Sequence, residues 1–361
     1  MSAASIPHLY VHVPFCAHRC GYCDFVTVTG HSDQRGRYVD ALIRELDRHR
    51  PRPQTIFIGG GTPSLLDDRD LARLLAALPA AQEITVECNP ETITPAKARA
   101  LVEGGVTRIS LGAQSFRPHL LRVLERRAGP ETVSHAIAVL RAAGIENLNL
   151  DLIFGVPGQS DDDLRADLRD ALAHAPEHVS YYELESKPGT RFRHRHGAEL
   201  ERQVEAMEGY YEAVVATLRD AGYRWYETAN FCLPGRECRH NLGYWLGHEY
   251  LGLGVGAVST IGLVRSRNAP SLARYLAAVE GGAEPPAHVE ALTVDERSME
   301  RLMLGLRLDR PLRLDGLAGL VDGDACVRLE GAGLLRRGVG TLALTDRGRF
   351  LANDVVATVL R

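Results

Sequence analysis

Over residues 1–226, short apolar runs rich in β-branched side chains alternate with longer amphipathic stretches. The apolar runs predict six strands, at residues 9–13, 55–59, 83–87, 108–112, 147–153 and 179–184. Between them the apolar residues recur at helical spacing, and strands that alternate with helices form parallel sheets covered by those helices. Six units are too few to close an eight-stranded barrel. We therefore expect an α/β fold with a partial, open TIM-like barrel of about six βα units.

Local signals mark the starts of several helices. Thr94 followed by Pro95 is typical of an N-cap and the first helical residue. Ser160 precedes a run in which leucine recurs every fourth residue, and Thr293 with Glu296 has the spacing of a capping box. These signals support the assignment of helices between and after the strands.

The alternation ends near residue 230, and this divides the chain into three parts. Residues 1–230 form the barrel core, and residues 231–290 are expected to be an irregular segment that ends in a Gly- and Pro-rich linker. Residues 291–361 predict a small α+β domain of helix, β-hairpin and helix, in the manner of a winged helix. Many winged helices bind DNA, but residues 297–361 carry eleven basic and eight acidic side chains, so we expect no nucleic-acid partner.

The composition narrows the class of protein further. The net charge is −4 and the isoelectric point about 6.4, which gives no general attraction to nucleic acid or to anionic membranes. The longest uncharged stretch, 250–264, is too short and too rich in glycine to span a bilayer. The first residues lack the basic and apolar regions of a secretory signal. We expect a cytoplasmic protein without a transmembrane segment.

Three of the seven cysteines, Cys16, Cys20 and Cys23, lie within eight residues, just after the first predicted strand. Thiolates are soft ligands that suit zinc or iron–sulfur clusters. A [4Fe–4S] cluster usually takes four thiolates, so three would leave one iron open to another ligand.

Spacing alone leaves two other interpretations of these cysteines open. The three could bind zinc together with His12, His18 or His31. Alternatively, Cys20 and Cys23 could form a redox-active CxxC pair.

Polar residues and glycines follow four successive predicted strands, where active sites of parallel barrels lie. They are Gly59–Gly61 with Thr62, then Glu87, Gln114 and Asp151. Each alone has an ordinary structural explanation, as a turn, a solvated acid or a surface amide. Their recurrence at four strand ends indicates a ligand site.

Two glycine patterns do not carry the chemistry they suggest. No Lys-Ser or Lys-Thr pair follows Gly59–Gly61, so this is not a P-loop. Gly252-x-Gly254-x-x-Ala257 matches the dinucleotide fingerprint, but the β-rich residues 258–262 follow it where a helix is required.

A second group of candidate ligands, Cys232, Cys238 and His240, lies in the third quarter of the chain. A CxxCH motif for covalent haem attachment is absent. His240 could ligate haem iron, but from the residues alone a buried, hydrogen-bonded histidine is the preferred interpretation.

The order of several longer strings resembles a known family over nearly the whole chain. It is the oxygen-independent coproporphyrinogen III oxidase-like family of the radical S-adenosylmethionine (SAM) superfamily. The matching strings are YVHVPFCAHRCGYCDF, FIGGGTPS, VECNPET, SLGAQSF, DLIFGVPGQ, YYELESKPGT, HNLGYW, LGLRL and LTDRGRFLAN.

The resemblance implies a site and its cofactors. Cys16, Cys20 and Cys23 would each hold one iron of a [4Fe–4S] cluster, and the amino and carboxylate groups of SAM would chelate the fourth. An electron from a reductant would then cleave the sulfonium to a 5′-deoxyadenosyl radical. The other SAM contacts implied are Tyr10, Tyr22, Gly60, Gly61, Thr62, Glu87, Gln114, Arg126 and Asp151.

Three features of the chain resemble the haem-chaperone branch of the family, HemW. Phe25 stands where the dehydrogenase branch has a further cysteine, and Tyr10 lies close to the start, without that branch's long N-terminal extension. The string from His240 to Trp245 matches HNxxYW, which that branch links to haem. A departure is Val258, which replaces the histidine of the usual GPGAHS string.

The resemblance thus implies a HemW-like chaperone that binds haem, with His240 as the candidate ligand, and delivers it to respiratory acceptor proteins. Two enzymatic functions remain as alternatives. One is the dehydrogenation of coproporphyrinogen III, and the other is radical methylation by the HemN-like methyltransferases.

Overall fold

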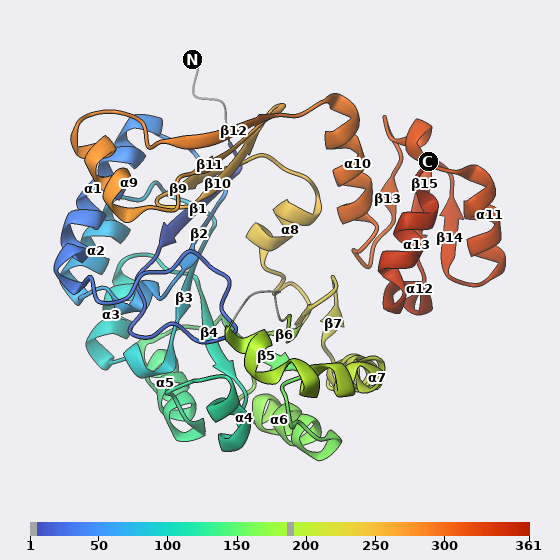
Figure 1. The fold of residues 1–361 in the computed structure, drawn as a ribbon, viewed down its shortest axis with the longest axis horizontal. Helices are drawn as coiled ribbons and strands as arrows, with labels where there is room; N and C mark the ends of the chain where they lie inside the picture. Colours follow the sequence, from blue (N-terminus) through green and yellow to red (C-terminus); the bar gives the residue numbers. More distant parts are fainter. Residues whose placement is uncertain (1–5, 186–190) are drawn as a thin grey trace.

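The computed structural model describes residues 6–185 and 191–361. One sheet of twelve strands forms the core, and a separate three-stranded sheet lies near the C-terminus (Figure 1). The six predicted strands are all present, and neighbours in sequence are parallel neighbours in the sheet. They are β1 (His8–Val13), β2 (Thr55–Gly60), β3 (Glu83–Cys88), β4 (Arg108–Gln114), β5 (Leu148–Phe154) and β6 (His178–Glu183).

Helices cover the outer face of this sheet, as the expected partial barrel requires (Figure 1). The predicted caps are confirmed: Thr94 and Ser160 accept hydrogen bonds from the backbone N–H groups of Lys97 and Asp163. The covering helices are α1 (Arg35–His49), α2 (Asp68–Ala77), α3 (Pro95–Glu103), α4 (Pro118–Val123), α5 (Pro130–Ala143), α6 (Asp161–Ala173) and α7 (Arg191–Asp220).

Residues 224–291 are more regular than the sequence indicated for the segment 231–290, because their strands extend both edges of the barrel sheet. β7 (Arg224–Trp225) and β8 (Asn230–Cys232) continue the sheet beyond β6. At the other edge β9 (Tyr250–Leu253) pairs in parallel with β1 and is thus a seventh parallel strand. The remaining elements are β10 (Val258–Ile261), β11 (Val264–Asn268), β12 (Ala287–Ala291), α8 (Arg239–Trp245) and α9 (Leu272–Glu280).

The fingerprint-like glycines of this segment connect antiparallel strands. Gly254 and Gly256 lie between β9 and β10 and have positive φ angles of 97° and 67°. A dinucleotide site needs a helix at this point, so the structure agrees with the rejection of that motif.

The C-terminal residues form a smaller unit with its own apolar core, which includes Leu302, Cys326 and Val356. Its α+β composition is confirmed, whereas the winged-helix type stays a prediction. The elements are α10 (Val294–Gly305), β13 (Leu312–Arg313), α11 (Gly323–Gly331), β14 (Leu335–Gly338), β15 (Thr341–Leu344), α12 (Asp346–Phe350) and α13 (Ala352–Val359). Helix α10 begins at the predicted capping box.

Arg349 of α12 joins this unit to the barrel. Its guanidinium lies 3.5 Å above the ring of Trp225 in β7 and donates a hydrogen bond of 2.8 Å to the Trp225 carbonyl oxygen. The side chain is buried, so both contacts are largely protected from water.

Replacing Arg349 by alanine should therefore weaken the junction. We expect Arg349→Ala to lower the free energy of unfolding by about 2 kcal/mol, the scale of a desolvated cation–π contact plus a hydrogen bond. Urea denaturation followed by tryptophan fluorescence measures this. The exposed Arg347→Ala, on the same helix, is the control and should change little; equal effects of the two variants would contradict the prediction.

Candidate functional site

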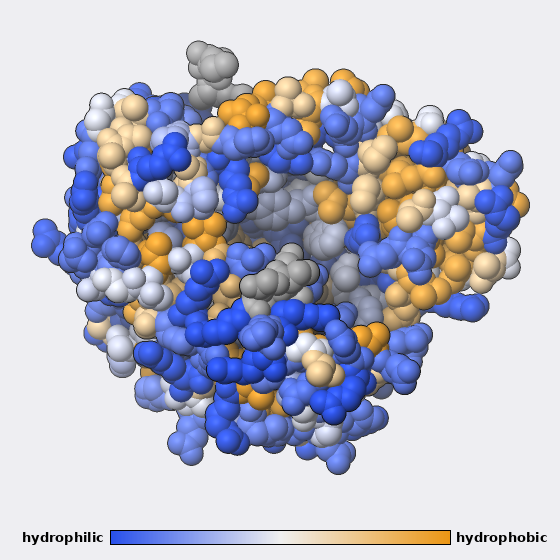
Figure 2. All heavy atoms as spheres, in the orientation of Figure 1, coloured by the Kyte–Doolittle hydropathy of each residue, from blue (hydrophilic) through white to orange (hydrophobic). Residues whose placement is uncertain are grey.

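The inner face of the barrel is polar, in contrast to the face under the helices. Along β1 the alternate residues Leu9, Val11 and Val13 are buried towards the helices, whereas Tyr10 and His12 bond to each other across the inner face. The strand ends that the sequence singled out surround this interior. Figure 2 shows a hollow near the middle of the view, where the interior of the barrel opens to the surface.

The three clustered cysteines lie on a loop that follows β1. Cys16 and Val28 fix its ends, because the Cys16 N–H donates to the Val28 carbonyl and the Val28 N–H donates to the Pro14 carbonyl. All three thiols are free and half-buried. Cys16 Sγ lies 3.6 Å from Thr62 Oγ1, so the loop contacts the glycine-rich segment after β2.

The histidines considered as further zinc ligands have other partners. His12 bonds to Tyr10 and to the Val26 carbonyl, and His18 approaches Glu125. His31 contacts Gln34. Within residues 6–185 and 191–361, no three His, Cys, Asp or Glu side chains converge as a single ion requires. A cubane places each thiolate on a different iron, so this spread is compatible with a cluster.

The thiols also lack the character of a redox CxxC pair. Burial raises the pKa of Cys16 and of Cys23. Reactive thiols of CxxC motifs have a lowered pKa. Cys23, one of the two thiols of the CxxC pair, thus lacks the lowered pKa of a redox-active thiol.

The glycines after β2 permit close contact with β1. A Cβ atom on Gly60 would lie 2.3 Å from the His12 ring, and one on Gly61 would lie 2.6 Å from the Pro14 carbonyl carbon. Gly60 also has a φ of 108°, which a side chain disfavours. The two glycines thus allow β1 and the start of the cysteine loop to pack directly against the backbone at the end of β2.

Two carboxylates follow on neighbouring strands. Glu87 accepts a 2.9 Å hydrogen bond from the Gly60 N–H, and Asp151 accepts bonds from Ser110 Oγ and Asn149 Nδ2. Burial, and to a lesser extent the charge of Asp151, raises the pKa of Glu87 to about 7. Burial also raises the pKa of Asp151. Such groups favour a bound cation, which would restore their ionised form.

Arg126 and Asn89 close the site at β3 and β4. Arg126 Nη2 donates to Asn89 Oδ1 at 2.9 Å and to the Gly112 carbonyl at 2.7 Å, and Asn89 Nδ2 donates to Thr62 Oγ1 at 3.1 Å. Among the described residues the buried Arg126 Nε has no partner. Asn89 was not singled out from the sequence, although it lies within the string VECNPET.

Gln114 marks a local irregularity at the end of β4. Its φ is 68°, unusual for a residue other than glycine, and the pairing of β4 with β5 shifts register here. Its amide nitrogen would lie 2.8 Å from a Cβ on Gly112. Strain of this kind gathers at ligand sites, which agrees with the prediction for Gln114.

The two tyrosines considered for SAM binding have different surroundings. Tyr10 stacks on Phe57 inside the barrel, and burial raises its pKa. Tyr22, within the loop, packs edge-on against Phe192 of α7. The contacts above thus join the glycine-rich segment, Glu87 and Arg126 around the cysteine loop, whereas Tyr10 and Asp151 lie within β1 and β5 rather than at their ends.

His240 lies at the other end of the strands. Helix α8 sits under the first residues of β2 and β3, and His240 Nδ1 is hydrogen-bonded to Thr55 Oγ1 at 2.8 Å. Its Nε2 bonds to the Tyr244 hydroxyl at 3.1 Å, and its backbone N–H donates to Glu83. Burial, reinforced by His8, lowers the pKa of His240 to about 3. The imidazole is therefore neutral and has both nitrogens engaged.

Comparison with known proteins places the chain in a family. Residues 10–171 match the model of the radical SAM superfamily. The chain is 39% identical to heme chaperone HemW of Mycobacterium tuberculosis, with 98% of this chain and 94% of that protein covered. It is 33% identical to heme chaperone HemW of Bacillus subtilis, covering 97% and 98%. The chain belongs to the HemW family.

A solved structure confirms the fold of this HemW-family chain. Coproporphyrinogen III oxidase (HemN) of Escherichia coli, a radical SAM enzyme, superposes with a TM-score of 0.82 over 98% of this chain and 90% of the enzyme. At 22% identity this likeness concerns architecture alone. Among the described residues, no helix has the length and apolar character needed to cross a membrane.

The raised pKa of Glu87 gives a pH-dependent prediction. Between about pH 5 and 8 the unfolded chain ionises this carboxyl before the folded chain does, so the folded state loses stability as the pH rises. Glu87→Gln keeps an acceptor for Gly60 but cannot ionise. Its free energy of unfolding, relative to wild type, should thus increase by roughly 2 kcal/mol across this range.

Chemical denaturation at several pH values measures this difference. Glu91→Gln is the matched control, because Glu91 is exposed on the turn that follows β3. A difference that is flat with pH for Glu87→Gln would show that the carboxyl is already ionised in the fold.

Proposed function

We propose that this protein is a haem chaperone that carries a SAM-ligating [4Fe–4S] cluster and transfers haem to acceptor proteins of respiration. The observation that carries the proposal is the nearly full-length similarity to curated heme chaperones, together with three free thiols on one loop. We also propose a cellular reductant for the cluster.

The residues present fit the cofactors. Cys16, Cys20 and Cys23 offer one thiolate for each of three irons, and Cys16 lies beside Thr62 of the glycine-rich segment. Reduction of a bound cluster would supply the electron that cleaves a sulfonium to a carbon radical.

The chain's own groups would position SAM. The backbone at Gly60–Thr62, held by Glu87 and Asn89, is suited to the polar methionine end of the cofactor. The carboxylates Glu87 and Asp151 favour its positive charge, and Arg126 fixes the strand end beside them. The domain boundary near residue 290 is proposed because the residues after it have an apolar core of their own, and the boundary near residue 230 because the alternation of strand and covering helix ends there.

His240 is proposed as a haem ligand, with a structural condition. Both of its ring nitrogens are hydrogen-bonded, so iron could bind only after the bond to Thr55 or to Tyr244 breaks. Cys238 is a weaker candidate, because burial raises the pKa of its thiol to about 12. A neutral imidazole is the form that ligates iron, and the lowered pKa of His240 ensures that form.

Phe25 favours a chaperone over a dehydrogenase. Its side chain is 66% exposed beside the cysteine loop and can neither ligate iron nor carry a proton. The methyltransferase alternative has no comparable observation in its favour.

The cluster has a direct test. Anaerobically reconstituted wild-type protein should contain close to four irons and four sulfides per chain. Cys16→Ala, Cys20→Ala and Cys23→Ala should each lose most of this iron, whereas Cys326→Ala, a buried cysteine of the C-terminal unit, should keep it. Iron and sulfide analysis measures the result; one zinc and no sulfide in the wild type would contradict the proposal.

SAM binding supplies a second readout on the same preparations. Addition of SAM should alter the electron paramagnetic resonance spectrum of the reduced cluster. Asp151→Ala should weaken this change without loss of iron, since Asp151 contacts no cysteine in the described structure.

The chaperone and the dehydrogenase are distinguished by a pair of assays. We expect haem to bind at about one per chain, with a Soret shift that His240→Ala weakens by roughly tenfold in affinity, about 1.4 kcal/mol. We expect no conversion of coproporphyrinogen III under reducing, anaerobic conditions with SAM. Catalytic formation of protoporphyrinogen would overturn the chaperone proposal. Unchanged haem binding by His240→Ala would contradict only the assignment of His240 as the haem ligand.

A further inference from the structure

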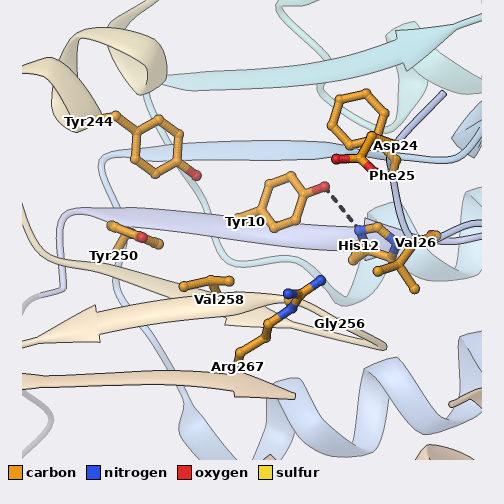
Figure 3. A pocket seen from close by; sticks show the side chains of 11 residues that line it. Tyr10, His12, Asp24, Phe25, Val26, Tyr244, Tyr250, Gly256, Val258 and Arg267 are labelled. Carbon is orange, nitrogen blue, oxygen red and sulfur yellow. Dashed lines mark hydrogen bonds between the residues drawn. The ribbon is translucent and has the colours of Figure 1, made fainter. Parts of the chain in front are cut away.

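A cavity of about 270 Å³ lies between the cysteine loop and the strands that extend the barrel beyond β1 (Figure 3). The loop contributes Phe25 and Val26, and the extension contributes Arg267 of β11. Phe25 and Arg267 are exposed, so the cavity opens to solvent. None of the residues considered for cluster or SAM binding, apart from Tyr10, lines it.

The walls of this cavity combine aromatic, aliphatic and charged surface. Tyr10, Tyr244 and Tyr250 present aromatic surface from β1, α8 and β9, and Val258 adds an aliphatic side chain from β10. Aromatic walls with a small number of placed polar side chains, here His12, Asp24 and Arg267, are typical of sites for planar organic molecules.

Arg267 is the cationic side chain of this lining. Figure 3 shows its guanidinium directed into the cavity towards His12. Among residues 6–185 and 191–361 it forms no ion pair, whereas Arg265, two residues earlier on the same strand, pairs with Glu300 at 2.8 Å. Asp24 is the acidic residue of the lining, and it comes from the cysteine loop rather than from the strands.

The charge of Arg267 also acts inside the cavity. Burial lowers the pKa of His12, and the guanidinium of Arg267 lowers it further. His12 therefore stays neutral and does not compete for an anion. The guanidinium is the group to which a carboxylate in the cavity would bind, with two parallel hydrogen bonds.

We propose that this cavity binds the edge of a planar, carboxylate-bearing tetrapyrrole and that Arg267 binds its carboxylate. The inference rests on the haem-chaperone function proposed above, in which the carboxylate is a propionate of haem. Because the cavity is open to solvent, one edge of haem would lie between the tyrosines and the remainder would extend through the open side. A ligand in this cavity would contact Tyr10, which is also among the residues considered for SAM binding.

The test compares two ligands on the wild type and on variants of Arg267. Absorbance titrations with haem and with haem dimethyl ester, whose propionates carry no charge, give the dissociation constants. Because a charge-assisted hydrogen bond favours the carboxylate but solvent screens the exposed Arg267, we expect the wild type to prefer haem to its ester by roughly tenfold. Arg267→Gln should remove this preference and Arg267→Lys should retain part of it, while the distant, exposed Arg52→Gln should leave it intact.

A second pair of variants tests the cavity itself. Val258→Trp should fill it and weaken both haem and its ester by about the same factor. Val264→Trp, at an exposed position outside the cavity, should weaken neither. Normal iron content and circular dichroism in each variant exclude misfolding as the cause.

The outcomes separate this inference from the function on which it rests. The assignment of the cavity would be wrong if wild type and Arg267→Gln preferred haem over its ester equally. It would also be wrong if Val258→Trp bound haem as tightly as the wild type. Either result would leave the chaperone function standing. Absence of haem binding by the reconstituted wild type would overturn both. The supporting result is that Arg267→Gln loses the preference for haem over its ester, while Arg52→Gln keeps it.

Discussion

The need to compensate buried charge in the barrel governs much of this structure. Asp151 is surrounded by donors, and one of them, Asn149, also bonds to His178, which bonds in turn to Tyr226. Tyr226 accepts from Asn241 in the string HNLGYW, so hydrogen bonds link the cofactor end of the barrel to helix α8. A buried polar network is stable only when every member has a partner. This requirement couples the string DLIFGVPGQ, which contains Asp151, to the string HNLGYW, which lies about ninety residues later.

Much of the architecture was predictable because it depends on local patterns. The six parallel strands follow from their apolar alternation and the helix starts from capping residues such as Ser160. The cysteine spacing left a cluster, zinc and a redox pair open, and the resemblance to radical SAM proteins favoured the cluster. The glycines after β2 were recognised as notable, but only the close approach to His12 and Pro14 explains why no other residue fits there.

What the sequence could not predict depends on long-range contacts. β9 has only four residues, and its parallel pairing with β1 joins segments about 240 positions apart. The side chain of Asn89 is hydrogen-bonded to Thr62 and Arg126, which lie on two other loops, and no local spacing reveals these contacts. His240 matched a motif by its letters, yet its enclosure by Thr55 and Tyr244 arises from packing of α8 beneath the strands.

The strands that extend the barrel have a consequence for the behaviour of the protein in concentrated solution. An open barrel would leave unpaired backbone groups at both edges of its sheet, and such edges recruit other chains into aggregates. Here one margin is the two-residue β7, too short to template an added strand. The other is β12, which is exposed along its length and carries the charged Glu290. The two edges thus differ: β7 is too short to pair with another chain, whereas on β12 the charge of Glu290 opposes such pairing.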